Sequence, residues 1–116
     1  MKKLHDSILD ILEENDFSVC SIDEQNGETV AELEWYSPLG EDVIVTIWYD
    51  GSDADFIRKF QDYAEDFDAE EHAAMWVNSR GGGNGVPNSI RDLLDDADAI
   101  DAKLCEVARY LESAEV

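Results

Sequence analysis

The spacing of the apolar residues changes at Asp50-Gly51, and this change constrains the fold more than any other feature of the sequence. From residue 17 up to this point, apolar and polar residues tend to alternate, which is the period of a strand with one buried face. After it, apolar residues recur every three or four positions, which is the period of an amphipathic helix. Strands followed by helices predict an α+β fold with an antiparallel sheet.

A short amphipathic helix is predicted before the strands. Its apolar residues have helical spacing and are Leu4, Ile8, Ile11 and Leu12. Acidic residues occupy its other faces, and the pattern ends near Asn15-Asp16. The sequence therefore predicts an N-terminal helix that packs one side against the rest of the chain.

Three strands are predicted after this helix. Residues 17–22 are β-prone, residues 31–35 alternate apolar with acidic side chains, and residues 43–49 are apolar on nearly both faces. The turn signals Asn26-Gly27 and Ser37-Pro38-Leu39-Gly40 separate them, so we expect a three-stranded antiparallel β-meander. Because a strand that is apolar on both faces is typical of buried positions, we expect the third strand to be central or covered by helices.

Three helices are predicted after the sheet. The first is capped by Ser52 or Asp53, and the second begins at Asp68, with Glu71 in the position of a capping box. The glycine-rich stretch at 80–87 then predicts a flexible connection, because such a sequence does not favour regular structure. The whole chain, residues 1–116, fits a single α+β domain.

A long amphipathic C-terminal helix follows, capped by Asn88 or Ser89. Its apolar positions have a three-four spacing and are Ile90, Leu93, Ala97, Ile100, Leu104, Val107 and Leu111. This stripe fits packing within the same chain, which we favour, but the same spacing also fits a helix–helix seam in a homodimer.

Charge is the feature that bears most on function. The chain has 29 acidic against 8 basic residues and a formal net charge of −21. Solubility or adaptation to high salt, an acidic face for a basic protein partner, and metal binding are the three explanations. Direct binding to nucleic acid or to an anionic membrane is disfavoured, because the charge has the wrong sign.

The sequence contains no motif that indicates an enzyme or a metal site. Its two histidines, His5 and His72, lie in no recognisable Ser/His/Asp or Cys/His pattern. No close Cys/His pairs suggest zinc, and Asp50–Asp55 has its glycine in the wrong position for a calcium loop. We expect no catalytic residue, no metal and no cofactor.

The two cysteines and the N-terminus bear on localisation. Cys20 and Cys105 are expected to be buried free thiols, although a disulfide between them stays open. No apolar segment follows the basic residues Lys2 and Lys3, and no run approaches the roughly 18 apolar residues of a membrane span. A cytoplasmic protein with no membrane contact is predicted.

The candidate binding residues are carboxylates that gather at three places. They lie at the turn between the second and third strands, around the junction of the two middle helices, and along the last helix. Each group by itself is explained more simply as a solvent-exposed helix face. Only the total number of acidic residues indicates a partner. The candidates for contact with a basic protein surface are Glu41, Asp42, Asp62, Glu65, Asp66, Asp68, Glu70, Glu71, Asp95 and Asp96.

The order of a helix, a three-stranded meander and acidic helices resembles the small acidic anti-CRISPR proteins. The stretch Tyr49–Phe60 and the run Glu65–Glu71 after it are similar to the sheet-to-helix passage of that family, and the similarity of pattern covers about the first 75 residues. Members of the family are DNA mimics that occupy the cleft in which Cas9 reads its PAM. The resemblance implies that Glu41 and Asp42 enter an arginine-bearing pocket that otherwise grips guanine. Residues 75–78 and 86–97 look like the tail of short proteins from bacterial mobile elements.

These observations predict a non-enzymatic acidic inhibitor, a DNA mimic, that binds the nucleic-acid cleft of a bacterial defence nuclease such as Cas9. The long glycine-rich stretch and the last helix depart from the smallest family members, which leaves the target and the binding face open. The alternative is an acidic protein-interaction module of a mobile element, dimeric through the C-terminal helix, whose acidity serves solubility.

Overall fold

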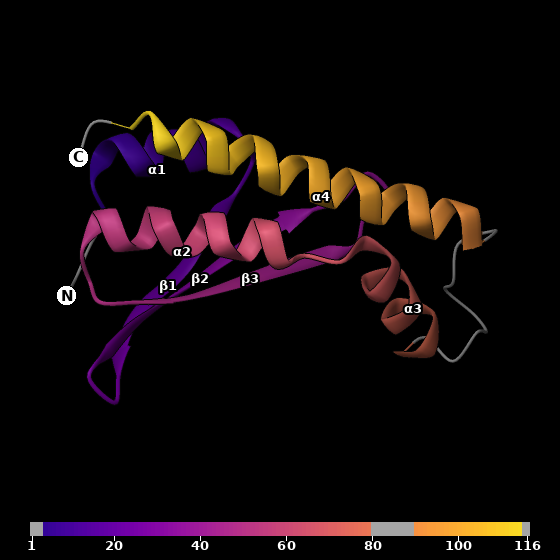
Figure 1. Ribbon diagram of the computed structural model, residues 1–116, viewed down its shortest axis with the longest axis horizontal. Helices are drawn as coiled ribbons and strands as arrows, with labels where there is room; N and C mark the ends of the chain where they lie inside the picture. Colours follow the sequence, from indigo (N-terminus) through magenta and orange to yellow (C-terminus); the bar gives the residue numbers. More distant parts are fainter. Residues whose placement is uncertain (1–3, 80–89, 115–116) are drawn as a thin grey trace.

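The computed structural model describes residues 4–79 and 90–114 and has the predicted α+β architecture (Figure 1). The elements in chain order are α1 (Asp6–Glu14), β1 (Ser18–Gln25), β2 (Glu28–Tyr36), β3 (Asp42–Tyr49), α2 (Asp53–Asp66), α3 (Ala69–Ser79) and α4 (Ile90–Glu112). The predicted connection at 80–87 and the predicted cap residues of the last helix lie outside the described residues.

The three strands form the predicted antiparallel meander, in the order β1-β2-β3. Gln25 pairs with Glu28, so Asn26 and Gly27 alone make the first turn. Both have positive φ angles, 52° and 84°, as a two-residue hairpin turn of type I′ requires. The strand β1 extends to Gln25, beyond the predicted end at residue 22, because this tight turn lets the pairing continue to its edge.

The prediction that the third strand is central was wrong, and the alternative that helices cover it holds for one of its two faces. The strand β3 is an edge strand, and its residues alternate between exposed and buried along its whole length. Val45 and Ile47 face the core, whereas Ile44 and Trp48 face outward and are exposed. Apolar character on both faces therefore does not mean burial on both faces here, because the described helices cover only one side of the sheet.

That covered side holds the main core. The helices α2 and α4 lie side by side across the sheet, and α1 contacts α4 and β1 (Figure 1). Phe56 and Phe60 of α2 and Ile100 of α4 are completely buried between the layers. Ring stacking of Phe17 on Trp35, with 6.0 Å between the centroids, closes the core near the end of α1.

From Leu93 to Leu111, the apolar stripe of α4 is buried within the chain, and the side chain of Ile90 lies outside the described part. The residues Leu93, Ala97, Ile100, Leu104, Val107 and Leu111 each have at most 1% of their surface exposed. The first of these residues form a small second core with Ala73 of α3, and the others join the main core. The favoured interpretation of the stripe, packing within the chain, is confirmed, and no exposed stripe remains along Leu93–Leu111 for a dimer seam.

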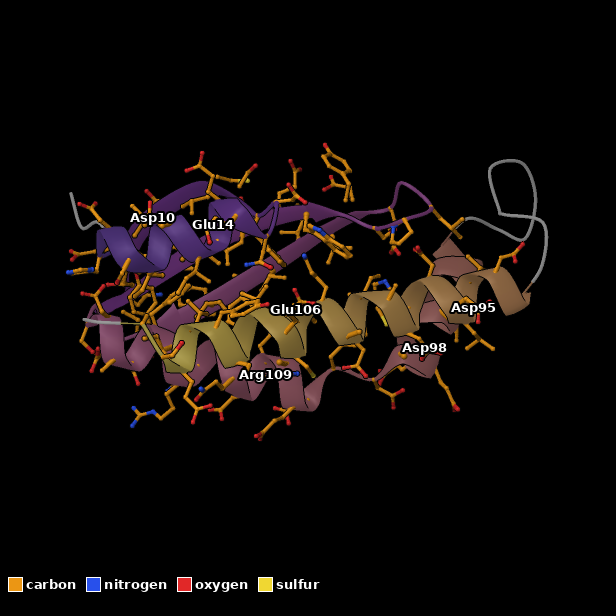
Figure 2. The ribbon with its side chains drawn as sticks, turned by 90° about the horizontal axis from the view of Figure 1, so that it is seen from above. Asp10, Glu14, Asp95, Asp98, Glu106 and Arg109 are labelled. Atoms are coloured by element: carbon orange, nitrogen blue, oxygen red, sulfur yellow. The ribbon has the colours of Figure 1, made fainter. Side chains whose placement is uncertain are left out.

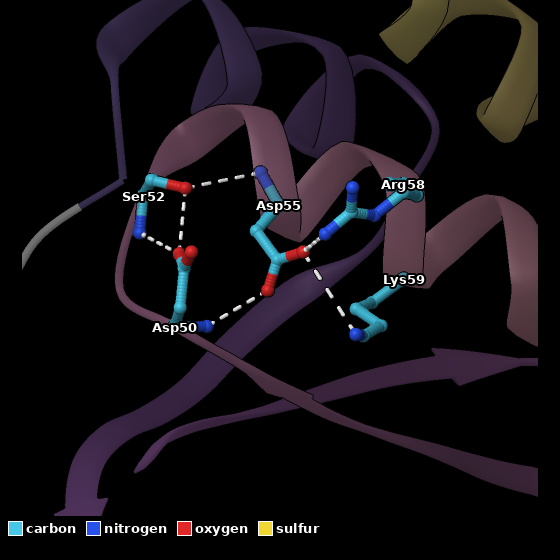
Figure 3. A network of polar contacts seen from close by, with 5 residues as sticks. All are labelled: Asp50, Ser52, Asp55, Arg58 and Lys59. Carbon is cyan, nitrogen blue, oxygen red and sulfur yellow. Dashed lines mark hydrogen bonds and ion pairs between the residues drawn. The ribbon is translucent and has the colours of Figure 1, made fainter. Parts of the chain in front are cut away.

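Hydrogen bonds at the sheet-to-helix passage fix the start of α2 (Figure 3). The hydroxyl of Ser52 accepts from the amide of Asp55 at 3.2 Å and donates to Asp50 at 2.6 Å. Asp55 accepts from the amide of Asp50 at 2.9 Å and forms ion pairs with Arg58 and Lys59. Ser52 is therefore the cap, and the hydrogen bonds that it donates to Asp50 lower the pKa of that carboxyl group.

Candidate partner-binding surfaces

Most of the carboxylates predicted to bind a partner are exposed on the helices. Figure 2 shows Asp95 and Asp98 near the start of α4, beside α3, with Asp10 and Glu14 on α1 at the other end of the molecule. The predicted residues that are exposed are Asp42, Asp62, Glu65, Asp66, Asp68, Glu70, Glu71 and Asp95. Six of these eight groups lie on α2, α3 or α4, and α3 packs on α4, so the packed helices hold them at fixed positions, which a binding surface requires.

Asp96, in contrast, is buried with 3% of its surface exposed. Its two carboxylate oxygens accept hydrogen bonds from the hydroxyl of Ser37 at 2.6 Å and from the amide of Leu39 at 3.0 Å. The hydroxyl of Ser37 in turn accepts from the amide of Glu41 at 3.0 Å. Asp96 thus holds the turn between β2 and β3 and does not face a partner in this conformation.

Glu41, the other exception, is used within the chain as well. Its Oε1 lies 2.8 Å from Nε2 of His72, and the Glu41 side chain is 12% exposed. This contact joins the turn before β3 to α3. Of the two turn residues that the anti-CRISPR resemblance indicates, only Asp42 is presented to solvent.

A groove lies at the junction of α2 and α3 and has a volume of about 300 Å³. Three of the predicted carboxylates line it, together with an apolar and aromatic floor. The lining residues are Tyr63, Asp66, Phe67, Asp68, Glu71, His72 and Met75. Asp68 also caps α3 by accepting from the amide of Glu71 at 3.1 Å, as predicted. The sequence predicts the acidic residues of the groove but not its aromatic lining. Tyr63 and Phe67 have the helical spacing of core residues, so the sequence gives no reason to expect them at a surface groove.

The uncovered side of the sheet forms a second surface, which we call the open sheet face. Its outward residues include Ser18, Cys20, Ser21, Asp23, Val30, Glu32, Glu34, Tyr36, Asp42, Ile44, Thr46 and Trp48. Tyr36 is 62% exposed, Ile44 41% and Trp48 43%, so large apolar side chains stand between the carboxylates. Apart from Asp42, none of these residues was predicted to bind a partner. The sequence does contain an indication of this surface. Alternate residues of a strand face the same side, and Tyr36, Ile44 and Trp48 alternate in this way with the acidic residues of their strands.

Like charges are concentrated at one end of the open sheet face. A hydrogen bond with Asp42 raises the pKa of the Glu34 carboxyl group, and partial burial and the charge of Asp42 act in the same direction. The nearby charges of Glu34 and Asp42 raise the pKa of the Tyr36 hydroxyl. Acidic groups this close together favour the approach of a cation.

The two histidines make structural contacts, and the two cysteines are free thiols. His5 accepts a hydrogen bond from the amide of Ser7 at 3.1 Å and caps α1. Both Cys20 and Cys105 are free and exposed, which corrects the expectation that they are buried. Partial desolvation and acidic neighbours raise the pKa of both thiols, the opposite of an activated cysteine. Within residues 4–79 and 90–114, no three His, Cys, Asp or Glu residues are grouped to hold a metal ion.

No helix in the described part of the chain combines the length and the apolar character needed to cross a bilayer. Comparison with protein-family models, with curated proteins and with solved structures finds no match. The anti-CRISPR resemblance therefore remains a hypothesis that depends on the pattern of the sequence.

Proposed function

We propose that this protein is a non-enzymatic acidic inhibitor that occupies a basic, nucleic-acid-binding surface of another protein. The observation that carries the proposal is the exposure of the helix carboxylates on a packed scaffold, with Asp66, Asp68 and Glu71 gathered around one groove. An acidic surface of this kind complements a cleft that is lined by lysine and arginine.

The protein resembles DNA in the density of its negative charge. Duplex DNA carries one phosphate charge per about 1.7 Å of its axis, and a protein that binds it releases condensed counter-ions. A surface with closely spaced carboxylates attracts the same lysine and arginine side chains. The association should therefore be fast at low salt and weaken as salt is added.

The resemblance suggests the PAM-reading cleft of a Cas9-type nuclease as the target. Because Glu41 is engaged with His72, Asp42 is the turn residue that would meet an arginine there. The helix carboxylates would then cover the neighbouring part of the nucleic-acid channel. The proposed partner is thus a basic protein surface, and nucleic acid itself is its competitor.

The second candidate function is an acidic interaction module of a mobile element whose charge serves solubility. The dimeric form of this alternative loses its basis, because the α4 stripe is buried in the described chain. The observation that favours an interaction module of some kind is the set of exposed aromatic and aliphatic side chains on the open sheet face.

A gel-shift competition tests the proposed function. Guide-loaded Cas9 is mixed with PAM-containing DNA and increasing amounts of the protein, and we expect loss of the DNA complex at low salt. Asp66→Asn with Glu71→Gln should weaken the inhibition, whereas Asp10→Asn with Glu14→Gln on α1 changes the net charge equally and should have little effect. DNA loading that stays intact at saturating protein would contradict the proposal for this nuclease.

A further inference from the structure

We infer that the open sheet face is a docking site for a basic, partly apolar protein segment. Such a segment would place an arginine guanidinium between Glu34 and Asp42 and its apolar side chains on Ile44 and Trp48. The inference shares with the proposed function the basic character of the partner and the residue Asp42. The docking site is on the side of the sheet that α2 and α4 do not cover. It can be tested without the nuclease.

The apolar side chains give the first reason. An antiparallel sheet with one solvent-facing side usually carries polar residues there. Here Tyr36, Ile44 and Trp48 lie on that side and are the most exposed large apolar residues of the strands. Val30, which pairs with Trp48, is only 8% exposed and extends the apolar surface into the middle strand. Aromatic residues with a polar rim are typical of the centres of protein interfaces.

The charges decide which occupant fits. Glu34 pairs across the strands with Ile44, and Tyr36 pairs with Asp42, so each carboxylate stands beside an apolar group. Glu32 continues the acidic row next to Thr46. A second copy of this chain would bring the same carboxylates against each other, with a charge of −21 on each partner. A basic protein segment is the occupant that complements both the charge and the apolar surface.

Arginine fits this face better than lysine. Its planar guanidinium donates several hydrogen bonds in a fixed fork and can contact two carboxylates at once. A guanidinium also stacks on aromatic rings through cation–π contacts, and Tyr36 and Trp48 are exposed rings on this face. Glu34 pairs with Ile44 and Asp42 pairs with Tyr36, so the two carboxylates lie on the same face of neighbouring strands, where one guanidinium can contact both.

The test is an NMR titration of the isotope-labelled full chain with a short peptide of alternating arginine and valine, acetylated and amidated at its ends. We expect the largest shifts at Ile44, the Trp48 indole and the neighbouring strand amides. Peptides with glutamate in place of arginine, or serine in place of valine, are the controls. The first should not bind, and the second should bind more weakly.

Matched variants separate local recognition from net charge. Glu34→Gln with Asp42→Asn should weaken binding about tenfold, as expected for the loss of a charge-assisted contact worth about 1.4 kcal/mol. Glu14→Gln with Asp10→Asn also removes one glutamate and one aspartate charge, but from α1, and should change the affinity much less. Ile44→Thr with Trp48→Ala should reduce binding of the valine peptide to the level of the serine peptide.

Three outcomes would overturn the inference. They are equal losses in the two charge-neutralised pairs, peptide shifts that map to the α2–α3 groove instead of the sheet, and no binding of the arginine–valine peptide. Shifts at the groove would leave the proposed function standing. Binding at the sheet, together with unchanged DNA loading of the nuclease, would contradict the proposed function and support the docking site.

Discussion

Asp96 of α4 accepts a hydrogen bond of 2.6 Å from the hydroxyl of Ser37, which lies 59 residues away in the sequence. Through this contact and its bond to the amide of Leu39, the helix fixes the turn that leads into β3. A residue that counts as one more acid in the sequence therefore acts as a structural acceptor. Its neighbour Asp95 is exposed, so two adjacent aspartates have different environments.

We predict that Asp96→Ala destabilises the fold by about 2 kcal/mol, because the buried hydroxyl of Ser37 and the partly buried amide of Leu39 lose their acceptor. Urea unfolding followed by circular dichroism measures the change. Asp95→Ala is the matched control and should stay within about 0.5 kcal/mol of the wild type, as surface substitutions usually do. Equal effects of the two substitutions would show that the contact with Ser37 has no role in stability.

The two faces of β3 give a second prediction, which uses one residue type on one strand. Ile47→Ala should cost about 3 kcal/mol, because its side chain is buried and its removal leaves a cavity. Ile44→Ala should cost less than about 1 kcal/mol, because its side chain is 41% exposed. Chemical denaturation of both variants checks this, and similar losses would mean that β3 is covered on both sides.

The Glu34 carboxyl group gives a prediction about pH. Its pKa is raised above the ordinary value of 4.5, chiefly by the hydrogen bond with Asp42, so the folded state keeps this proton to higher pH than the unfolded state. Ionisation of Glu34 therefore lowers stability as the pH rises through the raised pKa. Glu34→Gln should raise Tm slightly at pH 7, and the difference should vanish at a pH below 4.5, where the wild-type group is protonated.

Thermal unfolding over a range of pH measures this effect. Glu14→Gln is the control, since it removes one negative charge from α1 without touching the Glu34–Asp42 pair. A gain for Glu14→Gln equal to that for Glu34→Gln would mean that only the net charge matters. A gain for Glu34→Gln that persists unchanged in acid would contradict the assigned cause.

The packing of α4 predicts the result of a charged substitution in its stripe. Ile100 is completely buried in the main core, so Ile100→Lys should unfold the protein and not convert a dimer to a folded monomer. Sedimentation and circular dichroism of the wild type and the variant together decide this. A well-folded Ile100→Lys monomer that replaces a wild-type dimer would restore the helix seam as an interface.

The sequence alone determined the order of the elements and several of their ends. Asn26-Gly27 makes the predicted turn, Ser52 caps α2, and Asp68 caps α3. These features depend on residues that are close in the chain, such as the backbone conformations that Asn and Gly tolerate and the amides within reach of a side-chain oxygen. The spacing of apolar residues likewise identifies helices and strands, because it follows from their local geometry.

Only the tertiary structure decided which acids are exposed and which side of the sheet is open. Asp95 and Asp96 are the same residue type at adjacent positions, but only Asp96 contacts the turn at Ser37 and is buried. The strand β3 has apolar residues on both faces, yet α2 and α4 cover only one of them. Burial and pairing depend on contacts between segments far apart in the chain, so neither the count of carboxylates nor the local pattern of a strand contains them.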